Sequence, residues 1–406
     1  MTRSLRIILC ALLGLLCAAS PAAEPTPEEL NGIAGIPLFG SVRLWDERPA
    51  AVIRRLNVNC RAESSGGGQM FAAPIKRLVF GCPAAELRIF AVGGKVTRVD
   101  IFLVNKGDSA FGRKRRSTIK NELRRADAAL EKLLRKHFGK PVKHHFGSGA
   151  LRRQLPVWTC GGHALIVDFV DGEYLMIRLV PPETPGGRRR GKGGGDRAES
   201  GKNYSANVVR RPSGDVFIDN VPMVNQGRKG YCVPATVERV LRYFGVADVD
   251  MHNLAEKYKT GVGGKTRADR MMHGSKRLLG EYGLRMREVG ALKRHTLVRN
   301  IDQGLPVLWF HFATDEFRRR LDHSLKSRKR ATPEGWKRIL ASQKRLRQQT
   351  SNPHVALVIG YNRDTDEFAV SNSWGDQYRI AWVRYADMQQ VDAKLDLFVV
   401  QPRKQR

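Results

Sequence analysis

Hydrophobic and polar residues alternate in several stretches of the first half of the chain. Such alternation with β-branched residues predicts strands, and these cover Ala73–Phe80, Leu87–Val92, Val96–Val104 and Leu165–Leu179. Between the last two, Thr118–His137 carries apolar residues three and four positions apart, which predicts a helix with one buried face. That face comprises Ile119, Leu123, Ala126, Leu130 and Leu134. We therefore predict an α+β domain of unknown role over residues 24–182.

Residues 183–204 interrupt this pattern. They contain glycines interleaved with basic residues, among them Arg188, Arg189, Arg190 and Lys192. Such a stretch cannot bury enough apolar surface to order itself, which predicts a flexible Gly/Arg-rich linker. An arm that binds polyanions is the alternative.

The second half of the chain shows helical patterns first and strand patterns last. The expected helices are Cys232–Phe244, Met251–Tyr258 and Arg267–Tyr282. The expected strands are Leu305–Phe312, His354–Tyr361, Glu367–Ser371, Ala381–Tyr385 and Leu395–Val400. This order predicts a second α+β domain, residues 205–402, with two lobes. Residues 317–349 form a basic helical insertion within it, whose cations we expect to face outward.

The first 23 residues are typical of a signal peptide. Arg3 and Arg6 precede the apolar run Ile7–Ala18, and small residues follow it. No later stretch is apolar for the ~18 residues that a membrane-spanning helix needs. We expect an exported protein, periplasmic or extracellular, without a transmembrane segment after the signal peptide.

Charge and cysteine content add two expectations. The chain has 71 Lys and Arg against 39 Asp and Glu, a formal net charge of +32, which favours an acidic polymer or an anionic surface as a partner. A solvated basic surface without a specific partner is the alternative. An oxidising compartment permits a disulfide among Cys60, Cys82 and Cys160, and the sequence does not determine which pair forms. No spacing suggests a metal site, and we expect no cofactor.

Cys232 opens a predicted helix after the segment Gln226-Gly227-Arg228-Lys229-Gly230-Tyr231. Amides at a helix N-terminus lower the pKa of a thiol, and the thiolate is the reactive form. The amide side chain of Gln226 could join the Cys232 amide in an oxyanion hole. A buried structural cysteine is the alternative for this segment taken alone.

A second segment strengthens the catalytic interpretation. His354 begins an apolar strand, and Asn372 ends the next one within Ser371-Asn372-Ser373-Trp374-Gly375. A hairpin turning near residues 363–366 would bring Asn372 beside His354. An amide oxygen that accepts one imidazole N–H fixes the tautomer that a general base needs. Trp374 would cover this hydrogen bond.

Together these motifs resemble papain-like cysteine peptidases, over about half of the chain. The resemblance rests on the glutamine six positions before the cysteine, the glycines at 227 and 230, Gly360-Tyr361 after the histidine strand, and Asn-Ser-Trp-Gly. It implies that Cys232 is the nucleophile, His354 the base and then the acid, Asn372 its orienting partner, and Gln226 an oxyanion donor. The fold it implies is a papain-like domain preceded by a separate small α+β domain.

Details of these motifs refine the resemblance. Pro234 and Ala235 are more similar to the compact bacterial branch related to bacteriocin-leader peptidases. Lys229 and Tyr231 stand where the family has a second cysteine and a small residue. Beside the catalytic set, we assign substrate contacts to Gly230, Tyr231 and Trp374.

The segment Gly261–Thr266 is similar to a phosphate-binding loop, but Lys259 stands in place of the first glycine and a helix precedes it. We predict instead a turn in which Thr266 caps the next helix.

The first functional hypothesis is an exported cysteine peptidase that cleaves protein or peptide substrates through an acyl-thioester on Cys232. The same residues would serve an amidase or acyltransferase acting on a cell-wall or other small amide. A catalytically idle binding module for acidic polymers is the third hypothesis.

Overall fold

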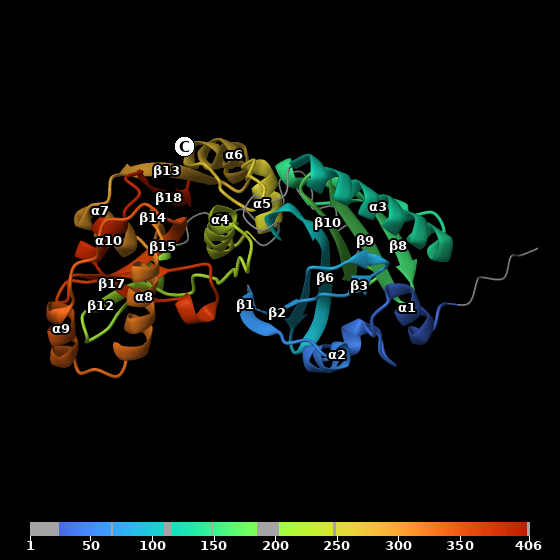
Figure 1. Ribbon diagram of the computed structural model, residues 1–406, viewed down its shortest axis with the longest axis horizontal. Coiled ribbons are helices and arrows are strands. Elements are labelled where there is room, and N and C mark those ends of the chain that lie inside the picture. The colour runs from blue at the N-terminus through green and yellow to red at the C-terminus, as the bar shows by residue number, and fades with distance from the viewer. Residues whose placement is uncertain are drawn as a thin grey trace, which may run out of the picture.

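The structure is a computed structural model of the chain, which describes residues 24–65, 68–108, 116–147, 149–184, 203–246 and 249–403 (Figure 1). The predicted signal peptide and nearly all of the predicted linker lie outside these ranges. Figure 1 shows two assemblies of helices and strands, an N-terminal region (residues 24–184) and a C-terminal region (residues 203–403).

The N-terminal region is built on one antiparallel sheet with the strand order β1-β2-β5-β6-β10-β9-β8-β7. Its strands are β1 (Arg61–Ser65), β2 (Gly68–Pro74), β5 (Glu86–Val92), β6 (Lys95–Asn105), β7 (Val142–Phe146), β8 (Arg153–Cys160), β9 (His163–Val170) and β10 (Tyr174–Val180). A small hairpin, β3 (Leu78–Val79) with β4 (Cys82–Pro83), and helices α1 (Pro27–Ala34), α2 (Pro49–Leu56) and α3 (Arg116–Phe138) complete it.

Helix α3 covers one face of this sheet, where it packs against β6, β8 and β10 (Figure 1). The predicted apolar face is confirmed: Ile119, Leu123, Leu130 and Leu134 are buried in the core of the region. The predicted strand Ala73–Phe80 is wrong in its second half. Strand β2 ends at Pro74, and residues 78–79 belong to the separate β3 hairpin because the chain turns between them.

The C-terminal region opens with two short strands, and helices then precede most of its remaining strands, as predicted. Its helices are α4 (Cys232–Tyr243), α5 (Met251–Lys257), α6 (Ala268–Glu281), α7 (Arg294–Asp302), α8 (Asp315–Ser327), α9 (Pro333–Ser342) and α10 (Tyr385–Val391). Its strands are β11 (Val208–Arg210), β12 (Asp215–Ile218), β13 (Leu284–Gly290), β14 (Val307–Phe312), β15 (Pro353–Asn362), β16 (Glu367–Ser371), β17 (Ala381–Arg384) and β18 (Leu397–Pro402).

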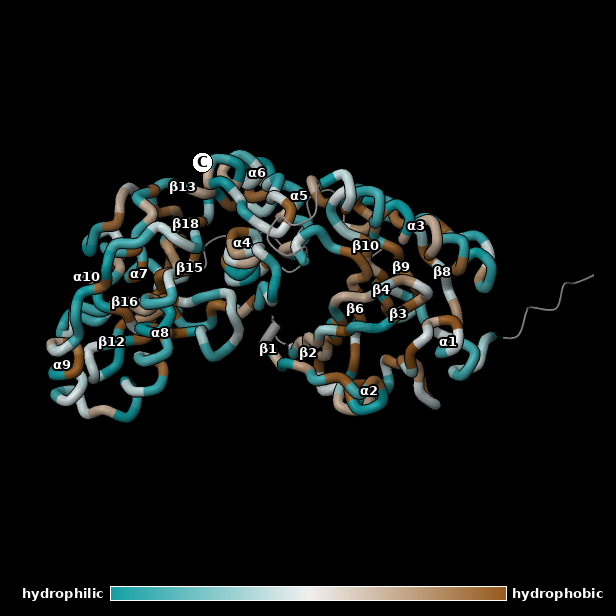
Figure 2. The backbone as a smooth tube through the Cα atoms, in the orientation of Figure 1, coloured by the Kyte–Doolittle hydropathy of each residue, from teal (hydrophilic) through white to brown (hydrophobic). Residues whose placement is uncertain are grey.

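The strands of this region form a second antiparallel sheet around β15. The order is β11-β12-β15-β14-β18-β13, and β16 pairs with both β15 and β17. Strand β15 is buried along nearly its whole length and packs against α4 and α7. In Figure 2 hydrophobic stretches lie on the strands inside each region, whereas much of the outer helices is hydrophilic. This arrangement places the start of β15 and the start of α4 next to one core.

The sequence patterns missed four elements of the C-terminal region: β11, β13, α7 and α10. Strand β13 pairs only with β18 and carries charged residues among its apolar ones. An edge strand of this kind lacks the clean alternation on which the prediction depends.

The predicted mixture of helices and strands is confirmed. The separateness of the first domain is not, because buried contacts join the two regions. Leu151 packs in the C-terminal core, and Val262 packs against the N-terminal one. The two regions therefore share buried apolar packing.

Three further expectations can be compared with the structure. Cys60, Cys82 and Cys160 are all free thiols, so no disulfide forms among them. Thr266 does not cap helix α6: its hydroxyl bonds that of Thr260 at 2.7 Å, and the N-cap is Arg267. Within the described residues, no helix has the length and apolar character to cross a membrane.

Candidate functional site

Cys232 is the first residue of helix α4, as the sequence predicted. Pro234 fits because the first turn of a helix needs no backbone hydrogen-bond donor there. The helix is held against strand β15, where the Thr236 hydroxyl donates to the Val355 carbonyl at 3.4 Å. The half-buried Cys232 side chain therefore faces the strand that carries His354.

His354 and Asn372 form the predicted hydrogen bond. Strands β15 and β16 are an antiparallel hairpin, and His354 Nε2 lies 3.0 Å from Asn372 Oδ1. Asn372 is fully buried, and its backbone amide donates to the Tyr378 carbonyl at 3.0 Å. Because Nε2 is held by the asparagine, Nδ1 is the nitrogen left for proton transfer.

Trp374 covers this pair, as predicted. Its ring lies 4.6 Å from the His354 ring, centroid to centroid, at an interplanar angle of 30°. The guanidinium carbon of Arg318, at the start of α8, lies over the Trp374 ring, 4.9 Å from its centroid, which is a cation–π contact. The insertion therefore reaches the candidate catalytic pair through Arg318.

Burial and nearby backbone amides act in opposite directions on the pKa of the Cys232 thiol. Burial raises the pKa of the Cys232 thiol, while amides of Val355, Val233 and Cys232 itself lower it without reversing the rise. Val355 directly follows His354, so this contact places the sulfur beside the histidine's own strand position. The expectation of a lowered thiol pKa is therefore wrong, because desolvation outweighs the helix terminus.

The pKa of His354 is held well below its usual range. Burial is the main cause, the neighbouring His311 and Arg318 add to it, and the hydrogen bond with Asn372 opposes it. With the thiol pKa raised and the imidazole pKa lowered, both groups are neutral at neutral pH in the resting site.

Gln226 is tied to the segment that follows Asn372. Its backbone amide donates to the Ser373 carbonyl at 2.9 Å, and its Oε1 accepts from the Ser373 hydroxyl at 2.6 Å. Its Nε2 donates to the Lys229 carbonyl at 2.8 Å, and an amide nitrogen has a second N–H. These bonds fix the side chain that the resemblance assigns to the oxyanion hole.

The predicted substrate contacts of Gly230 and Tyr231 stay predictions, and their positions favour structural roles. A Cβ on Gly230 would lie 2.1 Å from the Gly263 carbonyl oxygen, so only glycine allows the 261–264 loop to approach. Tyr231 is 1% exposed, and its hydroxyl donates to Asn105 Oδ1 at 3.0 Å. The predicted substrate contact of Trp374, which is partly buried, also stays a prediction.

Sequence reasoning missed His311. In the register of β14 with β15 it lies opposite His354, and the two rings are 5.3 Å apart at 88°. His311 is fully buried, its Nε2 lacks a hydrogen-bond partner, and burial lowers its pKa to about 3. The predicted strand 305–312 contained this histidine. Its pairing with His354 could not be predicted, because the register between two strands does not follow from the sequence of one of them.

The basic insertion differs from its prediction at two half-buried cations, Arg320 and Arg328. The Arg320 guanidinium lies 3.7 Å from the buried Asp387. Arg328 does not face outward: its guanidinium bonds Asp215 at 2.7 Å and 3.0 Å and Glu367 at 3.1 Å, and lies over the Trp382 ring. These partners lie on or beside strands that flank β15, which explains why Arg328 is half-buried. Lys329 and Arg330 are exposed, as expected.

A cavity of about 670 Å³ opens at the opposite end of β15, lined by residues that include Arg294, Arg299, Tyr361 and Arg363. It lies roughly eight residues, or about 26 Å, along the strand from His354. In the part of the chain that the structure describes, no three His, Cys, Asp or Glu side chains gather as metal ligands.

Comparison with known proteins agrees with this arrangement. Residues 218–393 match the model of the Peptidase_C39 like family. No curated protein matches the chain. The crystal structure of xylellain, a cysteine protease from Xylella fastidiosa, overlaps 52% of this chain and 92% of that chain, at 13% sequence identity and a TM-score of 0.32. No argument about this chain rests on that likeness.

The fold, the site and the family match together define the class. The C-terminal region is a cysteine-type peptidase, in agreement with the resemblance drawn from its motifs. The family it matches is the Peptidase_C39 like family, and the match contains Cys232, His354 and Asn372.

Proposed function

We propose that this chain hydrolyses peptide bonds through an acyl-thioester intermediate on Cys232. Residues 24–182 and 205–402 are its two domains in this proposal, and the second holds the chemistry. The observation that carries the proposal is the joint placement of three groups. The Cys232 thiol lies close enough to the Val355 amide for that amide to lower its pKa, and the adjacent His354 is hydrogen-bonded to Asn372 at 3.0 Å.

The geometry supports the following acylation step. As the Cys232 sulfur attacks the scissile carbonyl carbon, its proton passes to His354 Nδ1. The oxyanion accepts hydrogen bonds from the Cys232 amide and from Nε2 of Gln226. When the tetrahedral intermediate collapses, the C–N bond breaks and His354 returns the proton to the leaving amine. The product is a thioester between Cys232 and the acyl part of the substrate.

Deacylation uses the same residues with water as nucleophile. His354 accepts a proton from water as the oxygen attacks the thioester carbonyl. Collapse of the second intermediate breaks the C–S bond, and the thiolate takes the proton from His354. Asn372 holds the imidazole throughout, and Trp374 keeps bulk water from their hydrogen bond.

Cleavage mapping of a peptide library with the full chain tests this proposal. We expect new peptide termini with the wild type and none with Cys232→Ala. Cys160→Ala is the matched control, since Cys160 is a buried thiol in the other region. Cleavage by Cys232→Ala would refute the assignment. Transfer of the acyl group to an added amine, without hydrolysis, would identify an acyltransferase instead.

We also propose that the chain is exported, on the basis of the basic, apolar and small-residue pattern of residues 1–23. The substrates are then proteins or peptides outside the cytoplasm. An acidic polymer or anionic surface as a further partner is supported by the net charge of +32 and by exposed cations such as Lys329 and Arg330. Mass spectrometry of the mature N-terminus from a cell fraction tests export: an uncleaved, cytoplasmic chain would contradict it.

A further inference from the structure

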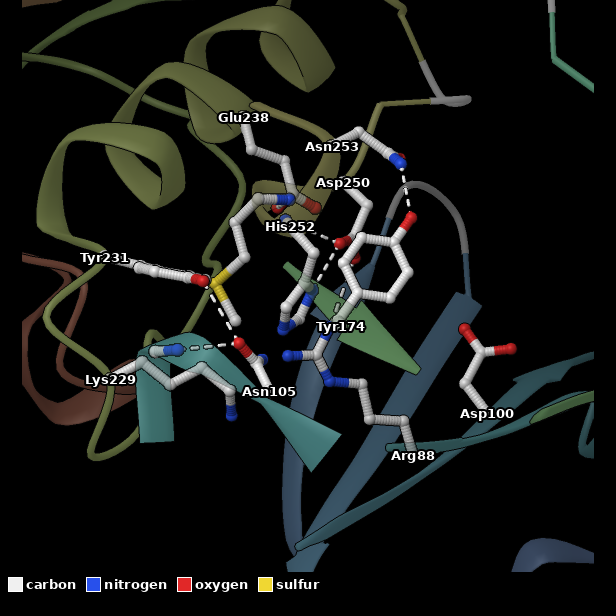
Figure 3. Close-up of polar contacts among 12 residues, drawn as sticks. Arg88, Asp100, Asn105, Tyr174, Lys229, Tyr231, Glu238, Asp250, His252 and Asn253 are labelled. Atoms are coloured by element: carbon white, nitrogen blue, oxygen red, sulfur yellow. Dashed lines mark hydrogen bonds and ion pairs between the residues drawn. The ribbon is translucent and has the colours of Figure 1, made fainter. Parts of the chain in front are cut away.

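The loop before the nucleophile is held by side chains of the N-terminal region. This nucleophile loop, residues 225–231, leads directly into Cys232. Figure 3 shows Lys229 and Tyr231 beside Asn105 of β6, with Arg88 of β5 close by. Three of its residues contact the other region: Asn225, Lys229 and Tyr231.

Lys229 is 2% exposed, and its counter-charges come from the N-terminal region. Its ammonium group pairs with Glu86 of β5 and, at 3.2 Å, with Asp108. Burying an ammonium group without a partner is strongly unfavourable. The buried position of Lys229 therefore depends on two carboxylates of the N-terminal region, Glu86 and Asp108.

Glu86 remains charged for this purpose. Burial alone would raise the pKa of its carboxyl, but the charges of Arg88 and Lys229 lower that pKa to about 2. Arg88 in turn pairs with Asp250, the N-cap of α5, at 3.2 Å. One chain of charges thus connects the nucleophile loop, strand β5 and helix α5.

Tyr231, the residue next to Cys232, is fixed by Asn105 and Gly107. Its hydroxyl donates to Asn105 Oδ1 at 3.0 Å, and the same oxygen accepts from the Gly107 amide at 2.8 Å. The Tyr231 ring lies so close to Gly107 that a Cβ there would be 2.6 Å from Cζ of the tyrosine. This packing leaves the ring, and hence the backbone before Cys232, little room to move.

The far side of the loop is clamped as well. The Gly263 amide donates to the Lys106 carbonyl of the N-terminal region at 3.0 Å. The same 261–264 segment presses against Gly230, whose missing Cβ allows the approach. The nucleophile loop is therefore enclosed by residues 86–108 and by a segment which those residues also bind.

Helix α5 also contacts the N-terminal region. The ring of His252 stacks on Phe102 of β6 at 4.1 Å. Asn253 donates to the Tyr174 hydroxyl of β10 at 2.9 Å (Figure 3). Glu238 of α4 accepts the Met251 amide at 2.7 Å, which links this helix to the one that Cys232 opens. The nucleophile loop and helix α5 thus both connect the N-terminal region to α4.

We propose that the N-terminal region is a positioning part of the catalytic unit, which holds the nucleophile loop through Lys229 and Tyr231. These are the two positions at which the loop departs from the papain-like pattern, and both departures are side chains bound by the N-terminal region. The inference rests on the proposed function for its catalytic readout. Lys229, Tyr231, Glu86 and Asn105 are positioning residues, since none of them touches the reacting atoms.

The test uses the full chain with Glu86→Gln, which leaves Lys229 near a neutral partner, and with Glu131→Gln as matched control. Glu131 forms an exposed ion pair with Arg135 on α3, away from the interface. Two rates are measured: alkylation of Cys232 by iodoacetamide, read from the Cys232 peptide by mass spectrometry, and kcat and KM on a cleaved peptide. A displacement of about 1 Å at a reacting group costs on the order of 100-fold in rate.

We expect Glu86→Gln to lower both the alkylation rate and kcat by roughly 10- to 100-fold, with KM nearly unchanged. Glu131→Gln should match the wild type. The double variant Glu86→Gln with Lys229→Met removes both charges and should recover most of the loss, because no buried charge is then uncompensated. A general loss of folding would lower activity without such recovery.

Tyr231→Phe is the milder variant, for the case in which Glu86→Gln does not fold. It removes one hydroxyl and should lower kcat several-fold while the melting temperature stays close to that of the wild type. Unchanged alkylation and kcat in the folded variants would overturn the inference, and so would increased rates, which would mean that the contact restrains the site. If the wild type cleaves no peptide, the proposed function fails, and the alkylation rates still decide the positioning inference.

Discussion

Each region of the molecule has a cysteine that lies beside a strand or strand end carrying a histidine. In the N-terminal region Cys160 and His163 are paired residues where β8 meets β9. In the C-terminal region Cys232 faces the start of β15, which carries His354. The two pairs have the same functional groups, but Cys160 and His163 both lie on strands, whereas Cys232 opens a helix, and their surroundings differ as well.

The surroundings of Cys160 and His163 suppress reactivity. Burial raises the pKa of the Cys160 thiol to about 12. His163 packs between the rings of Phe39 and Trp45, and its Nε2 accepts from the Leu44 amide at 3.3 Å. An Nε2 that accepts a backbone N–H cannot at the same time accept a proton from a thiol.

The surroundings of Cys232 differ in two respects. Burial raises the pKa of its thiol too, but backbone amides of the helix start and of Val355 oppose that rise, and Asn372 fixes His354 through Nε2 so that Nδ1 is left for the proton. Proximity of a thiol and an imidazole is therefore insufficient on its own. The comparison teaches that the amide donors and the orienting asparagine separate a candidate nucleophile from a core cysteine.

The largest expected effect separates the two cysteines directly. Cys232→Ala should reduce kcat by roughly 10⁴-fold or more, because no other group supplies the nucleophile. Cys160→Ala should leave kcat unchanged and lower stability by about 1–2 kcal/mol through the lost core packing. Steady-state kinetics and thermal unfolding of both variants check this. Equal loss of activity in the two would remove the distinction between the sites.

The second effect concerns the support of β15. Arg328→Ala should destabilise the chain by roughly 3–5 kcal/mol, because it leaves the buried carboxylates of Asp215 and Glu367 without their cation. Both carboxylates lie on strands that pair with β15. Lys329→Ala, at the next and exposed position, should change the free energy of unfolding by less than about 0.5 kcal/mol. Denaturant unfolding measures both, and similar small changes would show that Arg328 is a surface cation.

The third effect tests Gln226, the proposed oxyanion donor beside Cys232. Gln226→Ala should lower kcat by roughly 10²–10³, about 2.7–4 kcal/mol of transition-state stabilisation. KM should change little, since the oxyanion exists only along the reaction path. A variant that kept kcat and lost only substrate affinity would make Gln226 a substrate contact.

The smallest effect arises from the contact between the regions. The pKa of Glu86 in the folded chain is about 2, below the roughly 4.3 of an unfolded glutamate. A carboxyl whose folded pKa is depressed stabilises the fold fully above pH ~4.3 and loses that contribution as the pH falls towards 2. The contribution is on the order of 2–3 kcal/mol. Unfolding measured from pH 5 to pH 2 should show a loss that is smaller in Glu86→Gln; identical profiles would contradict it.

Local patterns predicted the elements whose signal lies within one segment. The buried face of α3, the start of α4 at Cys232 and the β15–β16 hairpin were all predictable, and the hairpin brought Asn372 to His354. Each depends on the spacing of apolar residues over a few turns or on one short loop.

Long-range contacts could not be predicted in the same way. Nothing in the sequence pairs Lys229 with Glu86, 143 positions earlier, or His311 with His354. Arg328 has the same local surroundings as the exposed Lys329, and only the position of Asp215 and Glu367 distinguishes them. The thiol pKa was mispredicted for a related reason, because the helix terminus is local whereas burial depends on the whole fold.

Detection of the acyl-enzyme tests the central claim most directly. The full chain is mixed with a p-nitrophenyl ester of an N-blocked amino acid, quenched in acid within the first turnover, and analysed by intact and peptide mass spectrometry. We predict one acyl group per chain, located on Cys232, which forms more slowly in Gln226→Ala and not at all in Cys232→Ala. Turnover of the ester without an adduct on Cys232, or with the adduct on another residue, would contradict the account.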